Sequence, residues 1–168
     1  HVVTANKAVI ARHGQEIAQA ANNSGVYVLI EAAVGGGIPI IEPLKQSLGG
    51  NRIKKVTGII NGTTNYILSK MAKDGTAYEA ILKDAQSLGY AEADPAADVE
   101  GLDAADKIAI LSGLAFGGSI NRENVPVQGI NKLKTRDIDY AKRLGYCIKL
   151  LAVAENLSCS NKPEGTST

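Results

Sequence analysis

The chain has 168 residues, and its 18 basic and 17 acidic side chains leave a formal net charge of only +1 at pH 7. A content of 45% hydrophobic and 21% charged residues allows a buried core and excludes a chain that is disordered by composition. The balanced charge argues against nucleic acid or an anionic membrane surface as the main partner, and 4% aromatic residues argue against a base-stacking surface. No apolar run approaches the roughly 18 to 20 residues that a membrane helix needs.

The two cysteines, Cys147 and Cys159, show neither a CxxC motif nor the spacing of metal ligands. Isolated cysteines of this kind suit a reducing compartment, so we expect a cytoplasmic protein. The chain opens on HVVTANK, as if in the middle of a strand, and we expect it to be part of a longer protein.

In the first part of the chain, residues 2–5 are expected to end a strand. Helical spacing follows from Asn6 to about Asn23 and stops at Gly25. Residues 27–34 are predicted as a strand that runs into three glycines. Residues 38–48 are predicted as a helix with Pro39 in its first turn, and residues 52–61 as a strand.

The second part of the chain is predicted to be richer in helices. Residues 62–73 form one, and Thr76 with Glu79 resembles a capping box that opens another, which ends at Leu88 and Gly89. Further helices are expected over 99–116 and 135–144, a loop with room for a short strand between them, and a strand over 146–155. Alternating elements favour an α+β fold with one mixed β-sheet and helices packed on it.

Residues 88–107, LGYAEADPAADVEGLDAADK, gather six carboxylates and end on one lysine. On the predicted helix, Asp103 and Lys107 are neighbours four residues apart and share a face with apolar side chains. The pair is therefore expected to point into a core or a cleft. The alternative is a surface ion pair worth a few tenths of a kcal/mol.

Calcium binding does not explain the acidic run. From either Asp94 or Asp98 the EF-hand pattern fails, and Pro95 interrupts it. Recognition of a small amino acid fits better: Glu92 and Asp103 would hold an ammonium group. Lys107 would pass a proton to or from a hydroxyl or carbonyl oxygen.

Three other stretches have the composition of site segments, each with a simpler alternative. Lys7 follows a strand end, where site residues often lie in α/β proteins, but it also suits an ordinary first turn of a helix. The glycines within 31–41 can expose carbonyl oxygens to a hard cation, or simply form a tight turn. The Asn61-Gly62-Thr63 sequence suits binding of a carboxylate or phosphate at a helix start, or only a helix cap.

Taken together, these segments resemble the catalytic region of homoserine dehydrogenases. The matching residues are TANK at 4–7, EAAVGGGIPII at 31–41, GIINGTTNYIL at 58–68 and, above all, the run at 88–107. The likeness covers about residues 1–154. It implies an oxidoreductase that interconverts L-homoserine and L-aspartate 4-semialdehyde with NAD or NADP, in the biosynthesis of threonine, methionine and isoleucine.

The resemblance also implies roles for individual residues. Lys107 matches the proton donor and acceptor, and Lys7 a lysine near cofactor and substrate. Thr4 and Ala5 match positions that line the nicotinamide. The substrate-binding positions are Gly89, Tyr90, Glu92, Asp98, Asp103 and Thr63. A monovalent-cation site, usually for sodium and built largely from backbone carbonyls, matches Glu31, Val34, Gly36 and Ile38.

Against the family pattern, the N-terminal dinucleotide-binding domain and the C-terminal segment are missing. We expect residues 1–5 to be the last strand of that domain, 6–155 the catalytic and dimerisation domain of a homodimer, and 156–168 a disordered polar tail. On this interpretation the chain alone is inactive or very weak. A non-catalytic module that binds an amino acid or assembles with subunits, and a dehydrogenase of another amino acid, are the alternatives.

Overall fold

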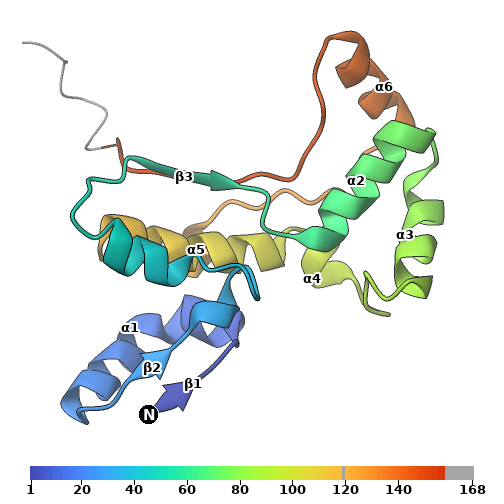
Figure 1. The fold of residues 1–168 in the computed structure, drawn as a ribbon. Helices are drawn as coiled ribbons and strands as arrows, with labels where there is room; N and C mark the ends of the chain where they lie inside the picture. Colours follow the sequence, from blue (N-terminus) through green and yellow to red (C-terminus); the bar gives the residue numbers. More distant parts are fainter. Residues whose placement is uncertain (119, 158–168) are drawn as a thin grey trace, which may run out of the picture. The chain divides into compact units, whose positions relative to one another are not determined.

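The computed structural model describes residues 1–118 and 120–157, which fall into two compact units (Figure 1). The first unit contains His1–Gly58, Lys107–Arg122 and the described residues from Val153 onward. The second unit contains Ile59–Asp106 and Glu123–Ala152. Each unit is described by itself. The predicted polar tail lies outside the described residues, apart from residues 156–157.

The first unit begins with a strand–helix–strand motif. Strand β1 (Val2–Val3) pairs in parallel with β2 (Val28–Leu29), and helix α1 (Lys7–Asn23) connects them. The Asn6 side chain accepts a hydrogen bond from the Val9 N–H at 3.2 Å and so caps the start of α1. Gly25, with a φ of 62°, follows its end. This motif confirms the predicted order and the helix ends.

The segment after β2 differs from the prediction. The strand expected over 27–34 is only two residues long, and a 3₁₀ helix, η1 (Glu31–Ala33), replaces its second half. The helix expected from Ile38 starts at 41 and continues as the π-helical η2 (Pro43–Ser47), so Pro43 rather than Pro39 lies in its first turn. The Glu31 carboxylate explains the new start, because it accepts hydrogen bonds from three backbone N–H groups at 40–42.

The remaining strands are also shorter than predicted. Strand β3 (Lys55–Gly58) pairs with β4 (Ala152–Glu155), and the Asn156 N–H donates to the Lys54 carbonyl at 2.9 Å beside them. In the described residues the four strands form two two-stranded sheets instead of one mixed sheet. The α+β class is confirmed, with helices as the larger part.

The second unit is helical and has its own apolar core. It is built from α2 (Gly62–Asp74), α3 (Tyr78–Ser87), α4 (Ala96–Val99) and α6 (Thr135–Arg143), and α2 packs on the other three (Figure 1). The buried cluster consists of Ile67, Leu68, Met71, Tyr78, Ile81, Ala85, Ala91, Val99, Ile130 and Ile138. The capping box predicted at Thr76 is wrong: Ala77 is the N-cap of α3, and its side chain makes no capping hydrogen bond.

The helix predicted over 99–116 starts at Leu102 instead and ends at Phe116, as predicted. Helix α4 ends at Val99, and α5 (Leu102–Phe116) begins after the turn at 100–101, where Gly101 has a φ of 84°. A loop packs closely on this turn: the Ile130 N–H donates to the Val99 carbonyl at 2.7 Å. A Cβ atom on Gly129 would lie 2.5 Å from that carbonyl oxygen. The loop also carries the 3₁₀ helix η3 (Arg122–Asn124).

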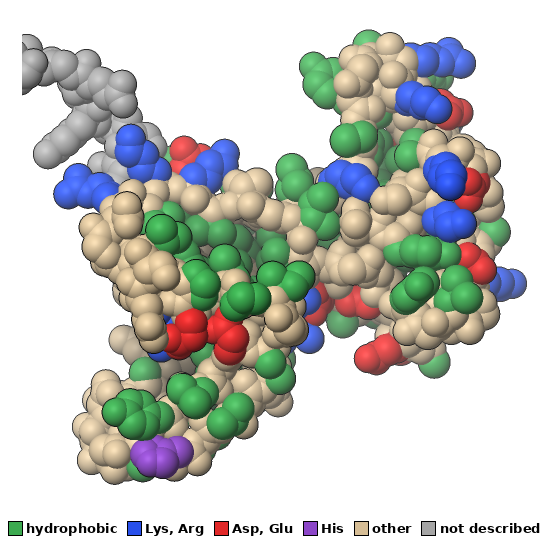
Figure 2. Space-filling view, viewed as in Figure 1, with side chains coloured by type: hydrophobic (Ala, Val, Ile, Leu, Met, Phe, Trp, Pro, Cys, Tyr) green, Lys and Arg blue, Asp and Glu red, His purple; other side chains and the backbone are tan. Residues whose placement is uncertain are grey.

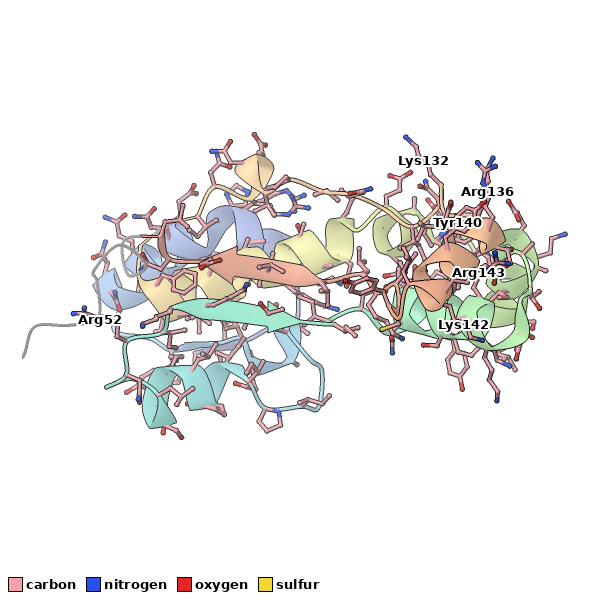
Figure 3. All side chains as sticks on the ribbon, turned by 90° about the horizontal axis from the view of Figure 1, so that it is seen from above. Arg52, Lys132, Arg136, Tyr140, Lys142 and Arg143 are labelled. Carbon is pink, nitrogen blue, oxygen red and sulfur yellow. The ribbon has the colours of Figure 1, made fainter. Side chains whose placement is uncertain are left out.

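Charges on the surface of the second unit are mixed in sign. Figure 3 shows the labelled side chains Arg136, Tyr140, Lys142 and Arg143 around α6, while Ile138 is buried in the core. Acidic and basic side chains lie beside one another over this unit in Figure 2, which fits the low net charge. Within the residues that the structure describes, every helix is too short or too polar to traverse a lipid bilayer.

Candidate functional site

An amide bridges two carboxylates in the second unit. The Asn61 Nδ2 atom donates to Asp98 Oδ1 at 2.7 Å and to Asp103 Oδ2 at 2.9 Å. Asn61 and Asp103 are 5% and 6% exposed, so the contact is shielded from water. Charge-assisted hydrogen bonds of this kind are among the stronger ones in proteins. We call these three residues the amide–carboxylate cluster.

The break between α4 and α5 makes this cluster possible. Asp103 comes five positions after Asp98, and on one continuous helix their side chains would point about 140° apart. The turn at Gly101 instead lets one carboxylate approach Asn61 from α4 and the other from the first turn of α5. The cluster therefore depends on the feature that the sequence analysis did not predict.

A second hydrogen bond connects the start of α2 to the loop after α3. The Thr63 hydroxyl, in the first turn of α2, donates to the Tyr90 carbonyl at 2.8 Å. The Tyr90 ring, which is exposed, lies against the Tyr66 ring with a centroid distance of 5.0 Å. Tyr66 in turn donates from its hydroxyl to Asp84 Oδ2 at 2.7 Å, and this hydrogen bond raises the pKa of Tyr66 to about 12.

The other predicted residues of the acidic run lie near these links in the sequence. Gly89 has a φ of 75° and ends α3 in the left-handed conformation that favours glycine. Glu92 is exposed, and its backbone carbonyl accepts a hydrogen bond from Gln86 at 3.1 Å. Lys107 is half-buried and follows Asp103 by four residues on α5.

The predicted cofactor positions all lie in the first unit, at the junction of β1 and α1. The Thr4 N–H donates to the Leu29 carbonyl at 2.9 Å, which extends the β1–β2 pairing. The Thr4 hydroxyl accepts a hydrogen bond from the Asn6 N–H at 3.1 Å, and Lys7 is the first residue of α1 and half-buried. Thr4, Ala5 and Lys7 thus lie directly after a parallel strand, a place where nucleotides often bind in α/β proteins.

The predicted cation segment also lies in the first unit. Partial burial acts to raise the pKa of the Glu31 carboxyl, but hydrogen bonds from the Glu42, Ile40 and Ile41 N–H groups outweigh it and lower this pKa. The Glu31 side chain thus caps the helix that starts at 41. Val34 is buried, whereas Gly36 and Ile38 are exposed. In the described part of the chain, no group of three or more His, Cys, Asp or Glu side chains could hold a metal.

Asn61 was named in the sequence analysis, but not among the substrate-binding positions that the family resemblance implies. Its position was considered as a helix cap, and it does cap α2, because Asn61 Oδ1 accepts hydrogen bonds from the Thr64 N–H at 2.9 Å and from the Thr64 hydroxyl at 2.8 Å. Only the tertiary structure shows that its amide nitrogen also reaches two carboxylates.

The structure is an α+β domain in which two carboxylates of the second unit meet one buried amide. The family model described as "Homoserine dehydrogenase" matches residues 39–167, and the chain therefore belongs to the homoserine dehydrogenase family. Among curated relatives, a homoserine dehydrogenase of Synechocystis is 67% identical over 155 residues, which is 92% of this chain. One of Bacillus subtilis is 51% identical over 155 residues, also 92% of this chain.

Solved structures agree with this assignment. A homoserine dehydrogenase from Thiobacillus denitrificans superposes with a TM-score of 0.90 at 54% identity, covering 92% of this chain and 36% of that one. A hyperthermophilic archaeal homoserine dehydrogenase in complex with NADPH gives a TM-score of 0.76 at 30% identity, covering 92% of this chain and 44% of that one. The chain spans about a third of the length of the relatives, 36% for those of Synechocystis and B. subtilis.

Proposed function

We propose that this chain forms the substrate-binding and catalytic part of an enzyme that interconverts L-homoserine and L-aspartate 4-semialdehyde, in the biosynthesis of threonine, methionine and isoleucine. Family membership supports the reaction. The observation that carries the site is the amide–carboxylate cluster, since the buried Asp103 and the half-buried Asp98 supply acceptors that suit the ammonium group of an amino acid.

In this proposal the acidic run binds the substrate. Asp98 and Asp103, with Glu92 from the preceding loop, hold the ammonium group. The backbone at Gly89 and Tyr90 borders the substrate, and the Thr63 hydroxyl supports that loop through the Tyr90 carbonyl. All these residues belong to the second unit, whose core orders the helices that carry them.

Lys107 carries the proton in the proposed reaction. It gives a proton to the aldehyde oxygen of the semialdehyde, or takes one from the homoserine hydroxyl in the reverse direction. Lys7 is the second catalytic lysine of the proposal, and it would lie near the cofactor and the substrate. Positioned acid–base groups contribute a factor of about 10² to 10⁴ in rate.

The cofactor in this proposal is NADP or NAD, which supplies or accepts the hydride when bound. Thr4, Ala5 and Lys7 would lie beside its nicotinamide. The archaeal relative in complex with NADPH supports the choice of cofactor class. Glu31, Val34, Gly36 and Ile38 would hold a monovalent cation, sodium by family resemblance, through backbone carbonyls.

The organisation of the chain remains part of the proposal. We assign residues 1–5 to the end of a dinucleotide-binding domain, 6–155 to the catalytic and dimerisation domain, and 156–168 to a polar tail. We propose a cytoplasmic homodimer. The 168 residues alone are expected to turn over substrate weakly, because the residues named here supply only part of a nicotinamide site.

The test is a chimera in which this chain replaces the matching 155-residue stretch of the Synechocystis homoserine dehydrogenase. Formation of reduced cofactor is followed with L-homoserine and with NAD or NADP. We expect turnover with L-homoserine, and a loss of about 10² to 10⁴ in kcat for Lys107→Met. Lys83→Met, at an exposed lysine of α3, is the matched control and should leave kcat unchanged.

Two results would contradict the proposal. Turnover of another amino acid with homoserine inert would favour a dehydrogenase of different specificity. Binding of homoserine without turnover, in a chimera that is folded and binds cofactor, would favour a non-catalytic module.

A further inference from the structure

We infer that Asn61 is a positioning residue that sets the separation and orientation of Asp98 and Asp103 toward the substrate ammonium group. This inference rests on the proposed function. It concerns a residue that touches the carboxylates and acts on the substrate through them.

The orientation of the Asn61 amide follows from its neighbours. Asn61 Oδ1 faces the Thr64 N–H, which can only donate, so the oxygen must be the acceptor on that side. The Nδ2 atom consequently points to the two carboxylates, which can only accept when ionised. Thr64 is completely buried, at 0% exposed, so the amide is held at its oxygen end by an ordered part of α2.

The two carboxylates need a residue that links them, because they lie on different helices. Asp98 belongs to the four-residue helix α4 and Asp103 to the first turn of α5, and the left-handed Gly101 lies between them. No single helix fixes their relation. The Asn61 amide gives one hydrogen to each, and it joins both to the start of α2.

The chemical type of residue 61 also matters. A lysine could join the carboxylates, but its charge would compete with the substrate ammonium. An aspartate could still cap α2, but it would place a third carboxylate beside the other two. Asparagine is neutral and carries both a cap acceptor and two N–H donors, so it orders the pair without cancelling its charge.

The experiment uses Asn61→Ser in the chimera. Serine is also a favoured N-cap, so α2 keeps its cap, but the short hydroxyl cannot bridge two carboxylates. We expect the KM for homoserine to rise at least tenfold, with the KM for the cofactor unchanged. Asn22→Ser, the same substitution at an exposed residue of α1, is the matched control and should leave the KM for homoserine within twofold.

A double-mutant cycle distinguishes positioning of the carboxylates by Asn61 from a general loss of order in the site. If Asn61 acts through both carboxylates, Asn61→Ser should raise the KM by a smaller factor in an Asp98→Asn background than in the parent, because only Asp103 remains to be positioned. A KM for homoserine within twofold of the parent, or equal rises for homoserine and cofactor, overturns the inference while the proposed function stands. A parent chimera that does not turn over homoserine overturns the proposed function, and this inference with it.

Discussion

The backbone of Ile130 is bonded to the backbone of Val99 through an N–H···O=C hydrogen bond of 2.7 Å. This contact joins a loop near α6 to the last residue of α4, at the turn that separates α4 from α5. Glycine is required at 129 for the close approach, since a Cβ there would lie 2.5 Å from the Val99 carbonyl oxygen and 2.7 Å from the Glu100 Cα. The conformation of this turn determines the positions of Asp98 and Asp103.

The Gly129→Ala substitution should therefore destabilise the protein. Both atoms that the new methyl group would meet are backbone, which cannot move aside without shifting the turn. We expect a loss of about 1 to 3 kcal/mol in the free energy of unfolding, the range typical of overpacking, measured by urea denaturation. Gly50→Ala is the control, since a Cβ at Gly50 meets no atom within 4 Å. Equal stability of the two variants would refute the close approach.

The Glu31 carboxylate should make stability depend on pH in the acid range. Its pKa is lowered in the folded state from an ordinary value of 4.5. Its stabilising contribution is thus fully present above pH 4.5 and is lost as the pH falls through the lower, folded-state pKa. Glu31→Gln should be less stable than the parent at pH 7, and the difference should shrink on acidification, by chemical denaturation at several pH values. Glu100→Gln, at an exposed carboxylate, should show no such convergence.

Tyr66 should titrate later than an ordinary tyrosine. The hydrogen bond to Asp84 is the main cause that raises its pKa to about 12 from 10.0. A raised pKa stabilises the folded state below pH 10, and that contribution is lost as the pH rises through about 12. Asp84→Asn should move the titration of Tyr66 toward 10.0, followed by NMR of ring-labelled tyrosine. An unchanged midpoint, equal to that of an Asp139→Asn control, would contradict this cause.

Asp103 should be needed for binding of homoserine even without turnover. Calorimetry of L-homoserine with the 168-residue chain is expected to show weak binding, because residues of the acidic run all lie within it. Asp103→Asn removes the charge with little change of shape and should abolish the heat of binding. Retention of binding by this variant would remove Asp103 from the ammonium site.

The features that were predicted correctly depend on local signals. Helices α1 and α2 begin at asparagine caps, Asn6 and Asn61, and are followed by the left-handed glycines Gly25 and Gly75. These signals operate within a few residues and are visible in the sequence. The burial of Asp103 was likewise predicted, from its place on the apolar face of a helix.

The features that were missed depend on contacts between distant segments. The loop around Gly129 packs on the turn at Gly101, and the two segments are far apart in the sequence. The shortening of β2 also involves a contact along the chain, since the Glu31 side chain accepts hydrogen bonds from backbone groups about ten residues later. The role of Asn61 was hidden for the same reason, because a cap and a bridge use different atoms of one side chain.

The division of the acidic run into two helices places a limit on how its length can vary. One residue inserted in the turn at 100–101 would lengthen the connection between the two helices by up to about 3.8 Å, which is longer than a hydrogen bond, and so carry the Asp103 side chain away from the Asn61 amide. An insertion in a surface loop has no such effect, because loop closure changes only slowly with length. In descendants of this chain, the number of residues between Asp98 and Asp103 should thus be as strictly retained as the two aspartates themselves.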